Sequence, residues 1–375
     1  MGRRVATGVV MLNMGGPARL QDVNAFLRRL FSDNELIDLG RWQSLLGPVI
    51  ANVRTPAIKK HYDEIGGGSP IGHWTRLQGE QMAAKLDALS PGTAPHKAYT
   101  AFRYAEPLTE HALMSMADDG VEHAIAFSQY PQYSCTTSGS SLNNLWRETE
   151  RLGVRDRFKW SVIDRWHVHE GYIGSVAACV QEGLKQVPES VRDDAVIVFT
   201  SHSLPLKVVE RGDPYPQQMA ATVQSVMQAI GYSHPYVHAW QSKVGRLPWI
   251  GPGTDHTITG LAKSGRKHLV VVPLGFTSDH VETLYELDIQ YAETARKAGI
   301  ATYVRAPSLN DSPLFTQALA DIVHDHMRHG RTPSRQYLLK CAHCTNPRCR
   351  TVVNPYHAQD QRAPIEGSRQ MAQSA

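Results

Sequence analysis

Short apolar runs recur along the chain, each followed by a turn rich in Gly, Pro, Ser or Asn and then by apolar positions at helical spacing. This alternation is typical of parallel β-strands joined by helices, because strands covered on both faces are apolar throughout. We expect strands at 8–12, 98–102, 123–127 and 160–163 in the first half, and at 195–200, 236–240, 268–272 and 301–304 in the second. The equal numbers indicate a duplicated unit.

The pattern predicts an α/β fold of two similar doubly wound, Rossmann-like domains, whose four-stranded parallel sheets face a central cleft. The first domain is expected at 1–185 and the second at 186–330, with the boundary in the segment 181–194. A short Cys-rich extension at 331–353 is expected to pack back on the first domain. The polar tail at 354–375 is expected to be disordered.

The composition of the 375 residues suits a globular enzyme large enough for two cores, with a net charge of +4 and no basic stripe interleaved with aromatic residues. Nucleic acid is therefore excluded as a partner. No apolar run reaches the roughly 20 residues of a spanning helix, and no signal segment precedes the first strand, so we expect a cytoplasmic protein. The segment 39–53, with Trp42 among its apolar residues, predicts either a helix on its own domain or peripheral contact with the inner membrane face.

An unusual density of acid and imidazole side chains follows the strand predicted at 268–272. If this segment is helical, a step of about 100° per residue places Asp279, Glu282 and Glu286 on one face. The alternative is a solvated helix face. A second strand end carries His202, which read alone favours a core histidine. Together, an imidazole and clustered carboxylates at strand ends favour proton transfer or metal delivery.

Three cysteines near the C-terminus, Cys341, Cys344 and Cys349, have the close spacing of ligands to one metal centre. Such a centre needs a fourth ligand. The candidates are Cys135, Cys179 and His343. Cys135 is preferred because it lies in a predicted loop at 129–135, whereas Cys179 lies in an apolar helical stretch. Spacing alone leaves zinc and a [2Fe-2S] cluster equally open.

Several long motifs occur in one order over residues 9–349, and together they resemble ferrochelatases, the enzymes that insert ferrous iron into protoporphyrin IX at the end of haem synthesis. The motifs are Leu-Asn-Met-Gly-Gly-Pro at 12–17, Ile-Gly-Gly-Gly-Ser-Pro at 65–70, Phe-Arg-Tyr at 102–104, the loop at 129–135, Ser-His-Ser-Leu-Pro at 201–205, Arg-Gly-Asp-Pro-Tyr-Pro at 211–216, Trp-Gln-Ser-Lys-Val-Gly at 240–245, and the acid-rich segment 277–288.

The resemblance implies a role for each matching residue. His202 corresponds to the catalytic imidazole and Glu282 to an opposing carboxylate, and both are expected to bind the substrate iron. His280, Asp279 and Glu286 correspond to an acidic route for protons or metal. The porphyrin pocket is expected to include Met14, Arg54, Tyr62, Ser69, Arg103, Tyr104, Trp249 and Phe276. The resemblance also implies that Cys135, Cys341, Cys344 and Cys349 bind a [2Fe-2S] cluster.

In the expected mechanism His202 takes pyrrole protons on one side of the ring while Glu282, backed by Asp279 and Glu286, handles charge and iron on the other. A π-bulge would bring more acids to the same face, and Arg54 or Arg103 would pair with the propionates. Two alternatives stay open: the same reaction on coproporphyrin III, or a non-enzymatic tetrapyrrole carrier or iron sensor. A bacterial origin and a homodimer are further expectations.

Overall fold

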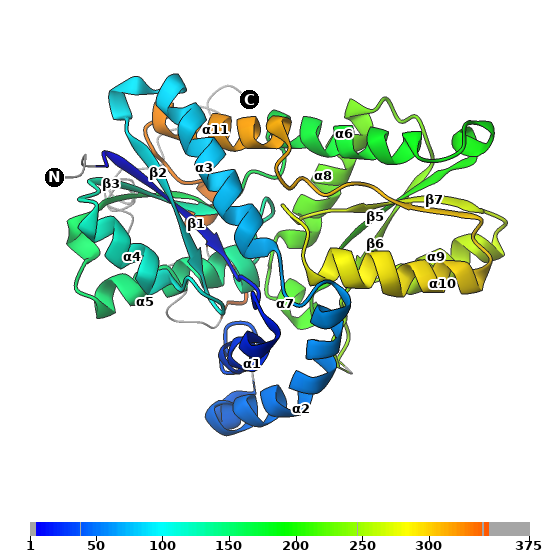
Figure 1. Cartoon of the computed structure of the whole chain (residues 1–375), viewed down its shortest axis with the longest axis horizontal. Coiled ribbons are helices and arrows are strands. Elements are labelled where there is room, and N and C mark those ends of the chain that lie inside the picture. Colours follow the sequence, from blue (N-terminus) through cyan, green and yellow to red (C-terminus); the bar gives the residue numbers. More distant parts are fainter. Residues whose placement is uncertain (1–4, 38, 246, 340, 345–375) are drawn as a thin grey trace, which may run out of the picture.

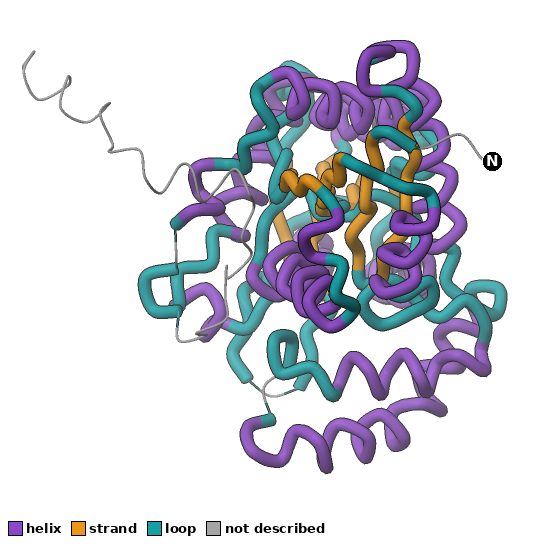
Figure 2. Tube along the Cα trace, turned by 90° about the vertical axis from the view of Figure 1, so that its left-hand side faces the viewer, coloured by secondary structure: helices purple, strands orange, loops and turns teal. Residues whose placement is uncertain are grey.

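The computed structural model describes residues 5–37, 39–245, 247–339 and 341–344. Cys349 and the predicted tail at 354–375 lie outside the described residues. Within the described part of the chain, strands lie inside a shell of helices, as Figure 2 shows.

All eight predicted strands are confirmed, in two parallel sheets of four. The first sheet contains β1 (Thr7–Asn13), β2 (His96–Phe102), β3 (His123–Ser128) and β4 (Lys159–Ile163), in the order β2-β1-β3-β4. The second contains β5 (Val196–His202), β6 (Tyr236–Gln241), β7 (His268–Pro273) and β8 (Thr302–Arg305), in the order β6-β5-β7-β8. The two orders are equivalent, so the predicted duplication and fold class are confirmed (Figure 1).

Helices follow most strands and cover the sheets (Figure 1). In the first half they are α1 (Val23–Phe31), α2 (Gln43–Glu64), α3 (Ile71–Leu89), α4 (Thr109–Asp118), α5 (Ser140–Arg151) and α6 (Glu170–Lys185). In the second they are α7 (Leu206–Glu210), α8 (Tyr215–Ala229), α9 (Thr254–Lys263), α10 (Ala292–Ala298) and α11 (Pro313–Arg328). Among the described residues two segments are π-helical, Cys135–Gly139 and Glu282–Tyr291.

The central strand β1 shows why the chain folds this way. Residues 9–12 are at most 1% exposed, because helices cover the sheet on both faces and leave no position for a polar side chain. The strand ends at a turn in which Gly15 has a φ of 75°, and a Cβ at this position would lie 2.7 Å from the ring of Phe102. Only glycine allows this conformation so close to the end of β2.

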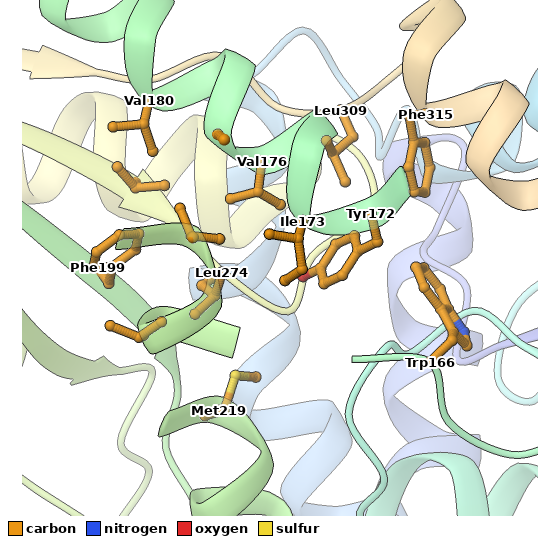
Figure 3. Close-up of a cluster of buried hydrophobic side chains, with 14 of the residues drawn as sticks. Trp166, Tyr172, Ile173, Val176, Val180, Phe199, Met219, Leu274, Leu309 and Phe315 are labelled. Carbon is orange, nitrogen blue, oxygen red and sulfur yellow. The ribbon is translucent and has the colours of Figure 1, made fainter. Parts of the chain in front are cut away.

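The largest hydrophobic core joins the two halves of the molecule. Figure 3 shows Tyr172 and Val176 of α6 in this core. Around them lie Phe199 of β5, Phe315 of α11 and Leu274, which follows β7. Helix α6 contacts the second sheet, since a Cβ on Gly183 would lie 2.9 Å from Val270. Helix α11 in turn reaches α3 of the first half, where Lys85 donates to Gln317 at 3.2 Å. The predicted domain limits stay a prediction, but each half contributes a helix to the other.

Helix α2 exposes a row of apolar side chains. Trp42 before the helix and Leu45, Val49 and Val53 within it are between 51% and 75% exposed. Their spacing of three to four residues places them along one side of the helix. In the part of the chain that the structure describes, no helix has both the length and the apolar character to cross a membrane.

Candidate functional site

The end of β5 brings His202 into contact with Glu282, the first residue of the second π-helix. The His202 Nδ1 and Glu282 Oε2 atoms lie 2.9 Å apart, and the two side chains are 36% and 17% exposed. A carboxylate can only accept, so Nδ1 carries the hydrogen, and the lone pair of the neutral imidazole is at Nε2. The structure therefore gives His202 the tautomer that can accept a proton at Nε2.

A second carboxylate joins this pair through Ser242. The Ser242 hydroxyl lies 3.2 Å from Glu282 Oε2 and 2.7 Å from Glu286 Oε2, while Gln241 donates to Glu286 at 3.0 Å. Ser242 follows β6 with a φ of 63°, a left-handed conformation that is costly for a non-glycine residue. The π-helix that carries both acids confirms the expected departure from α-helical geometry at this site.

The charges of the three groups depend on one another. Burial lowers the pKa of His202, but the adjacent carboxylate of Glu282 outweighs it, so the pKa of His202 lies above its ordinary value. Burial alone would raise the pKa of Glu282, yet the His202 imidazolium holds it well below its usual range. Burial and the negative charge of Glu282 raise the pKa of Glu286 to about 7. Glu286 can therefore hold a proton near neutral pH.

The predicted common helical face of Asp279, Glu282 and Glu286 is wrong, because Asp279 lies outside the π-helix and accepts a hydrogen bond from its Thr283 hydroxyl at 2.9 Å. Asp279 precedes the helix, and its carboxylate accepts hydrogen bonds from Ser308 at 2.6 Å, Asn310 at 2.8 Å and Arg305 at 3.1 Å. Burial raises the pKa of Asp279, but Arg305 and the hydroxyl and amide donors have the larger, opposite effect. The pKa of Asp279 therefore lies below its ordinary value. The physical reason for the difference is Arg305, a largely buried cation that attracts the carboxylate.

His280 lies at the edge of the same site. Its Nδ1 lies 3.0 Å from the carbonyl oxygen of Ser278, which can only accept, so the lone pair of the neutral ring is again at Nε2. The rings of His280 and Phe276 have centroids 4.7 Å apart, and the Trp249 ring lies 6.3 Å from that of His202. The two predicted aromatic residues thus lie beside the two histidines.

Other predicted porphyrin contacts gather in the first half. Met14, Tyr62 and Tyr104 belong to one apolar cluster with Val281, the residue before Glu282. Burial raises the pKa of Tyr62, and the negative charge of Glu282 raises it further. Two more predicted residues lie elsewhere around this cluster. They are Ser69, which a Cβ on Gly16 would touch at 2.7 Å, and Arg54, exposed on α2.

Arg103 already has acidic partners within the chain. Its side chain is only 5% exposed and forms ion pairs with Asp33 and, at 3.5 Å, with Glu35. Tyr104 also donates to Asp33, at 2.7 Å. Asp33 and Glu35 thus already pair with the guanidinium, while its Nη1 atom has no hydrogen-bond partner among the described residues, so the pairing of Arg103 with a propionate stays a prediction. Arg54 keeps its charge at the surface.

The predicted placement of His202 and Glu282 on opposite sides of a porphyrin ring is also wrong for this conformation. A flat ring between two side chains needs roughly 7 Å, the sum of two van der Waals contacts of about 3.5 Å. The 2.9 Å hydrogen bond between the two groups leaves no such space. The structure therefore has both groups on the same side of any ring that approaches them.

Two of the predicted cysteine ligands meet at one segment of the chain. The amide of Cys135 donates to Asp213 at 2.7 Å, and a Cβ on the neighbouring Gly212 would lie 3.6 Å from Cys341 Cβ. The amide of Cys344 donates to the carbonyl oxygen of Cys341 at 3.0 Å. Cys349 lies outside the described residues. Among the residues that the structure describes, no group of three His, Cys, Asp or Glu side chains stands ready to hold a metal ion.

Comparison with known proteins assigns the chain to a family. The model of the family described as Ferrochelatase matches residues 6–327. The chain belongs to the ferrochelatase family. It is 52% identical over 360 residues to a mitochondrial ferrochelatase of Xenopus laevis, covering 96% of this chain and 87% of that protein. The mitochondrial ferrochelatase of Homo sapiens is 52% identical over 358 residues, with 95% and 84% covered. That of Schizosaccharomyces pombe is 49% identical over 348 residues, with 93% and 82% covered.

Sequence reasoning missed several residues that shape this candidate site. Ser242 and Gln241 hold the two carboxylates, and Asn310 holds Asp279. Their signal in the sequence is position, since Gln241 ends β6 and Ser242 follows it, next to the strand that carries His202. Polar residues at the carboxyl ends of neighbouring parallel strands meet at one edge of the sheet.

Proposed function

We propose how this ferrochelatase inserts ferrous iron into protoporphyrin IX to form protohaem, the terminal step of haem synthesis. Insertion of one Fe²⁺ releases two pyrrole N–H protons, so the site needs groups that accept protons next to the ring. His202 is the proposed base. The observation that supports this assignment is the hydrogen bond between His202 Nδ1 and Glu282, which leaves a lone pair at Nε2 and stabilises the imidazolium that forms.

The protons leave His202 along a short polar path in this proposal. Glu282, Ser242 and Glu286 follow one another at 2.9, 3.2 and 2.7 Å, which are hydrogen-bonding distances. The raised pKa of Glu286, caused by burial and by the charge of Glu282, allows it to receive a proton near neutrality and release it again. His280 is the proposed next group outward. Glu282 and His202 become available to Fe²⁺ once they have passed on their protons.

The remaining predicted residues are proposed to hold the ring. Met14, Tyr62 and Tyr104 supply apolar contacts, and Trp249 and Phe276 place aromatic faces beside His202 and His280. Such contacts can support a bent ring whose nitrogen lone pair tilts out of plane, with strain offset by binding energy elsewhere. Ser69 and the exposed Arg54 are the proposed polar contacts, Arg54 for a propionate. Arg103 and Asp279 are assigned positioning roles, because their charges are already paired.

An anaerobic assay with ferrous iron, following the Soret band, tests the assignment. His202→Ala should abolish metallation while protoporphyrin affinity stays within about tenfold, because the imidazole moves protons more than it anchors the ring. His256→Ala, at an exposed position on α9, is the matched control and should keep wild-type turnover. Near-normal turnover in His202→Ala would remove the base. A wild-type protein that binds porphyrin and never metallates it would be a carrier, and faster metallation of coproporphyrin III would change the substrate.

For the cysteines we propose a [2Fe-2S] cluster held by Cys135, Cys341, Cys344 and Cys349. The donor set fits, because four thiolates are the usual ligands of such a cluster. The placement of Cys135 and Cys341 at the segment 211–213 supports the proposal, although the described residues alone do not assemble a metal site. When bound, the cluster would supply a covalent tie between the C-terminal extension and the Cys135 loop.

Colour and metal content test this centre. The purified protein should be reddish brown with acid-labile sulfide, since zinc is d¹⁰ and gives no charge-transfer bands. Cys135→Ala should lose the colour. Cys179→Ala should keep it, because Cys179 packs against the main hydrophobic core and burial raises its pKa to about 11. Zinc without sulfide would exclude the cluster, and loss of colour in the Cys179 variant alone would change the fourth ligand.

The exposed apolar row on α2 is proposed as a surface for peripheral membrane contact. Arg41 and Arg54 border it, as is usual for segments that lie on anionic lipid. A dicarboxylate porphyrin is itself lipophilic, so contact with a lipid surface suits the substrate. A cytoplasmic location on the inner face of the membrane, a bacterial origin and a homodimer stay predictions.

A further inference from the structure

The segment 211–215 lies between the cysteine-bearing parts of the chain and His202. It begins directly after α7 and ends at the first residue of α8. Two of its residues, Asp213 and Tyr215, are buried, at 2% and 7% exposure. A buried carboxylate and a buried phenol in so short a connection need partners, and these partners lie in two different directions.

On the cysteine side, Asp213 holds the Cys135 loop. Its Oδ2 atom accepts hydrogen bonds from the Cys135 amide at 2.7 Å and the Ser134 hydroxyl at 3.0 Å. Its Oδ1 atom accepts from the amide of Tyr215 at 3.0 Å. Hydrogen bonds to an ionised carboxylate are stronger than neutral ones, so Asp213 fixes the loop and the start of α8 together.

The C-terminal extension contacts the same segment from another side. The carbonyl oxygen of Arg211 accepts a hydrogen bond from the amide of His343 at 3.1 Å. Gly212 has a φ of 97°, and a Cβ there would lie 3.1 Å from the amide nitrogen of Ala342. The close approach of Cys341 to the chain thus requires glycine at this position.

On the active-site side, Tyr215 reaches His202. Its hydroxyl donates to the carbonyl oxygen of His202 at 3.0 Å, and its ring tilts against that of Trp240 with centroids 5.9 Å apart. The His202 imidazole is partly exposed and makes its hydrogen bond to Glu282 from the last residue of β5. The anchor on its backbone therefore helps to set where the imidazole stands.

We propose that Asp213 and Tyr215 are positioning residues that connect the Cys135 and Cys341 segments to His202. Asp213 holds the loop that carries Cys135. Tyr215 holds the end of β5 through its hydrogen bond to the backbone of His202, so the placement of β5 depends on the placement of the segment 211–215. Order at the cysteines is thereby coupled to the placement of the imidazole. The inference rests on the proposed roles of His202 and the cysteines, and it adds two residues that neither touch the reacting atoms nor bind metal.

Tyr215→Phe tests the active-site end of this connection. The variant keeps the ring and the contacts of Asp213 and loses only the hydroxyl, so metal content and visible absorption should stay at wild-type values. We expect kcat to fall about fivefold, the effect of one neutral hydrogen bond, with the KM for porphyrin unchanged. Tyr232→Phe, at an exposed tyrosine, is the matched control and should change neither constant. Wild-type kcat in Tyr215→Phe would overturn the active-site link.

Asp213→Asn tests the cysteine end. It replaces an acceptor facing the Cys135 amide by an amide that can donate, so loss of iron to a chelator should become at least about fivefold faster. The ¹⁵N resonances of the His202 ring, assigned by their absence in His202→Ala, should shift in the same variant. Asp193→Asn, exposed before β5, is the control and should change neither measurement. Iron retention and His202 resonances identical to wild type would overturn the connection.

These measurements separate the connection from the proposed function. If the wild type fails to metallate porphyrin, the function is refuted, but a shift of the His202 resonances in Asp213→Asn still supports the connection. If His202→Ala lacks activity while Tyr215→Phe and Asp213→Asn behave as wild type, the function stands and the connection is refuted. Far-UV circular dichroism on each variant shows whether it is folded. If Asp213→Asn is unfolded, the kcat of Tyr215→Phe alone decides whether the connection stands.

Discussion

At the scale of single residues, Glu282 determines the chemistry of the site, because one of its oxygens faces both His202 and Ser242. Ser242 has a single hydroxyl hydrogen and lies within bonding distance of two carboxylates. Ser242 can donate to only one of the two carboxylates. The other contact is a hydrogen bond only if that second acid is protonated and donates to the Ser242 oxygen. Glu286, with its raised pKa, is the acid suited to keep the proton. Near neutral pH the site can thus hold one proton beside the proposed base, and Glu286 has to release this proton before it can receive the next.

The pH dependence of turnover should report the His202–Glu282 pair. The pKa of His202 lies above its ordinary value of 6.5, and the protonated ring has no lone pair to accept a pyrrole proton. Turnover should therefore fall as the pH decreases through this raised pKa. In Glu282→Gln the carboxylate that raises the pKa is gone while burial still lowers it, so the acid limb should move to lower pH.

In the same variant the maximal kcat should decrease on the order of a hundredfold, because the imidazolium loses its stabilising charge. Glu189→Gln, at an exposed position, serves as the control. The measurement is kcat against pH from pH 5 to pH 9, a range chosen around the ordinary pKa of histidine. An acid limb that stays in place in Glu282→Gln would show that it belongs to another group.

At the scale of elements, the π-helix Glu282–Tyr291 is held from outside by α2. Tyr285 stacks on His61 of α2, with ring centroids 3.9 Å apart and an interplanar angle of 16°. Long π-helical segments are rare because their hydrogen bonding is less favourable than that of an α-helix. A contact with another element therefore helps to keep this segment, and its two acids, in place. The same contact connects the helix that carries the exposed apolar row to the segment that carries Glu282 and Glu286.

Removing this stack should loosen the π-helix. In His61→Ala the amides of 282–291 should exchange hydrogen with solvent about fivefold faster, because local opening loses an aromatic contact worth about 1 kcal/mol. Hydrogen exchange followed by mass spectrometry measures this effect. Exchange in α9, remote from the stack, is the internal reference. Equal exchange of the π-helix in both proteins would mean that its own packing, and not α2, maintains it.

The sequence predicts strands and strand ends well, because a buried parallel strand is apolar throughout and a site at its carboxyl end follows from the topology. His202 and Glu282 are found in this way. Asp279 is misplaced because its position depends on Arg305, which is 26 residues away in the sequence. The partners of Arg103 are equally distant, with Asp33 separated by 70 residues. Long-range pairing of charges has no local pattern, so sequence periodicity does not reveal it.

At the scale of the whole molecule, the apolar row on α2 should govern attachment to lipid. Leu45→Glu combined with Val53→Glu should reduce flotation with vesicles of phosphatidylcholine and phosphatidylglycerol at least about tenfold. The reason is that two apolar side chains that become buried in lipid contribute several kcal/mol to binding. Leu314→Glu is a matched control, since Leu314 and Leu45 are both 59% exposed. Equal flotation of the two variants would contradict the membrane proposal. Unfolding midpoints should confirm that both variants are folded.

The exchange of α6 and α11 between the halves has a consequence for how the chain folds and how far it can be divided. A Cβ on Gly171 of α6 would lie 2.8 Å from Ala318 of α11, so the two exchanged helices also touch each other (Figure 1). Each sheet therefore needs a helix from the other half to cover it. Unfolding in urea should give one coincident transition by tryptophan fluorescence and by far-UV circular dichroism. Fragments cut between 185 and 186 should aggregate when expressed singly and recover turnover only when coexpressed. Two separate transitions would show that each sheet is stable alone.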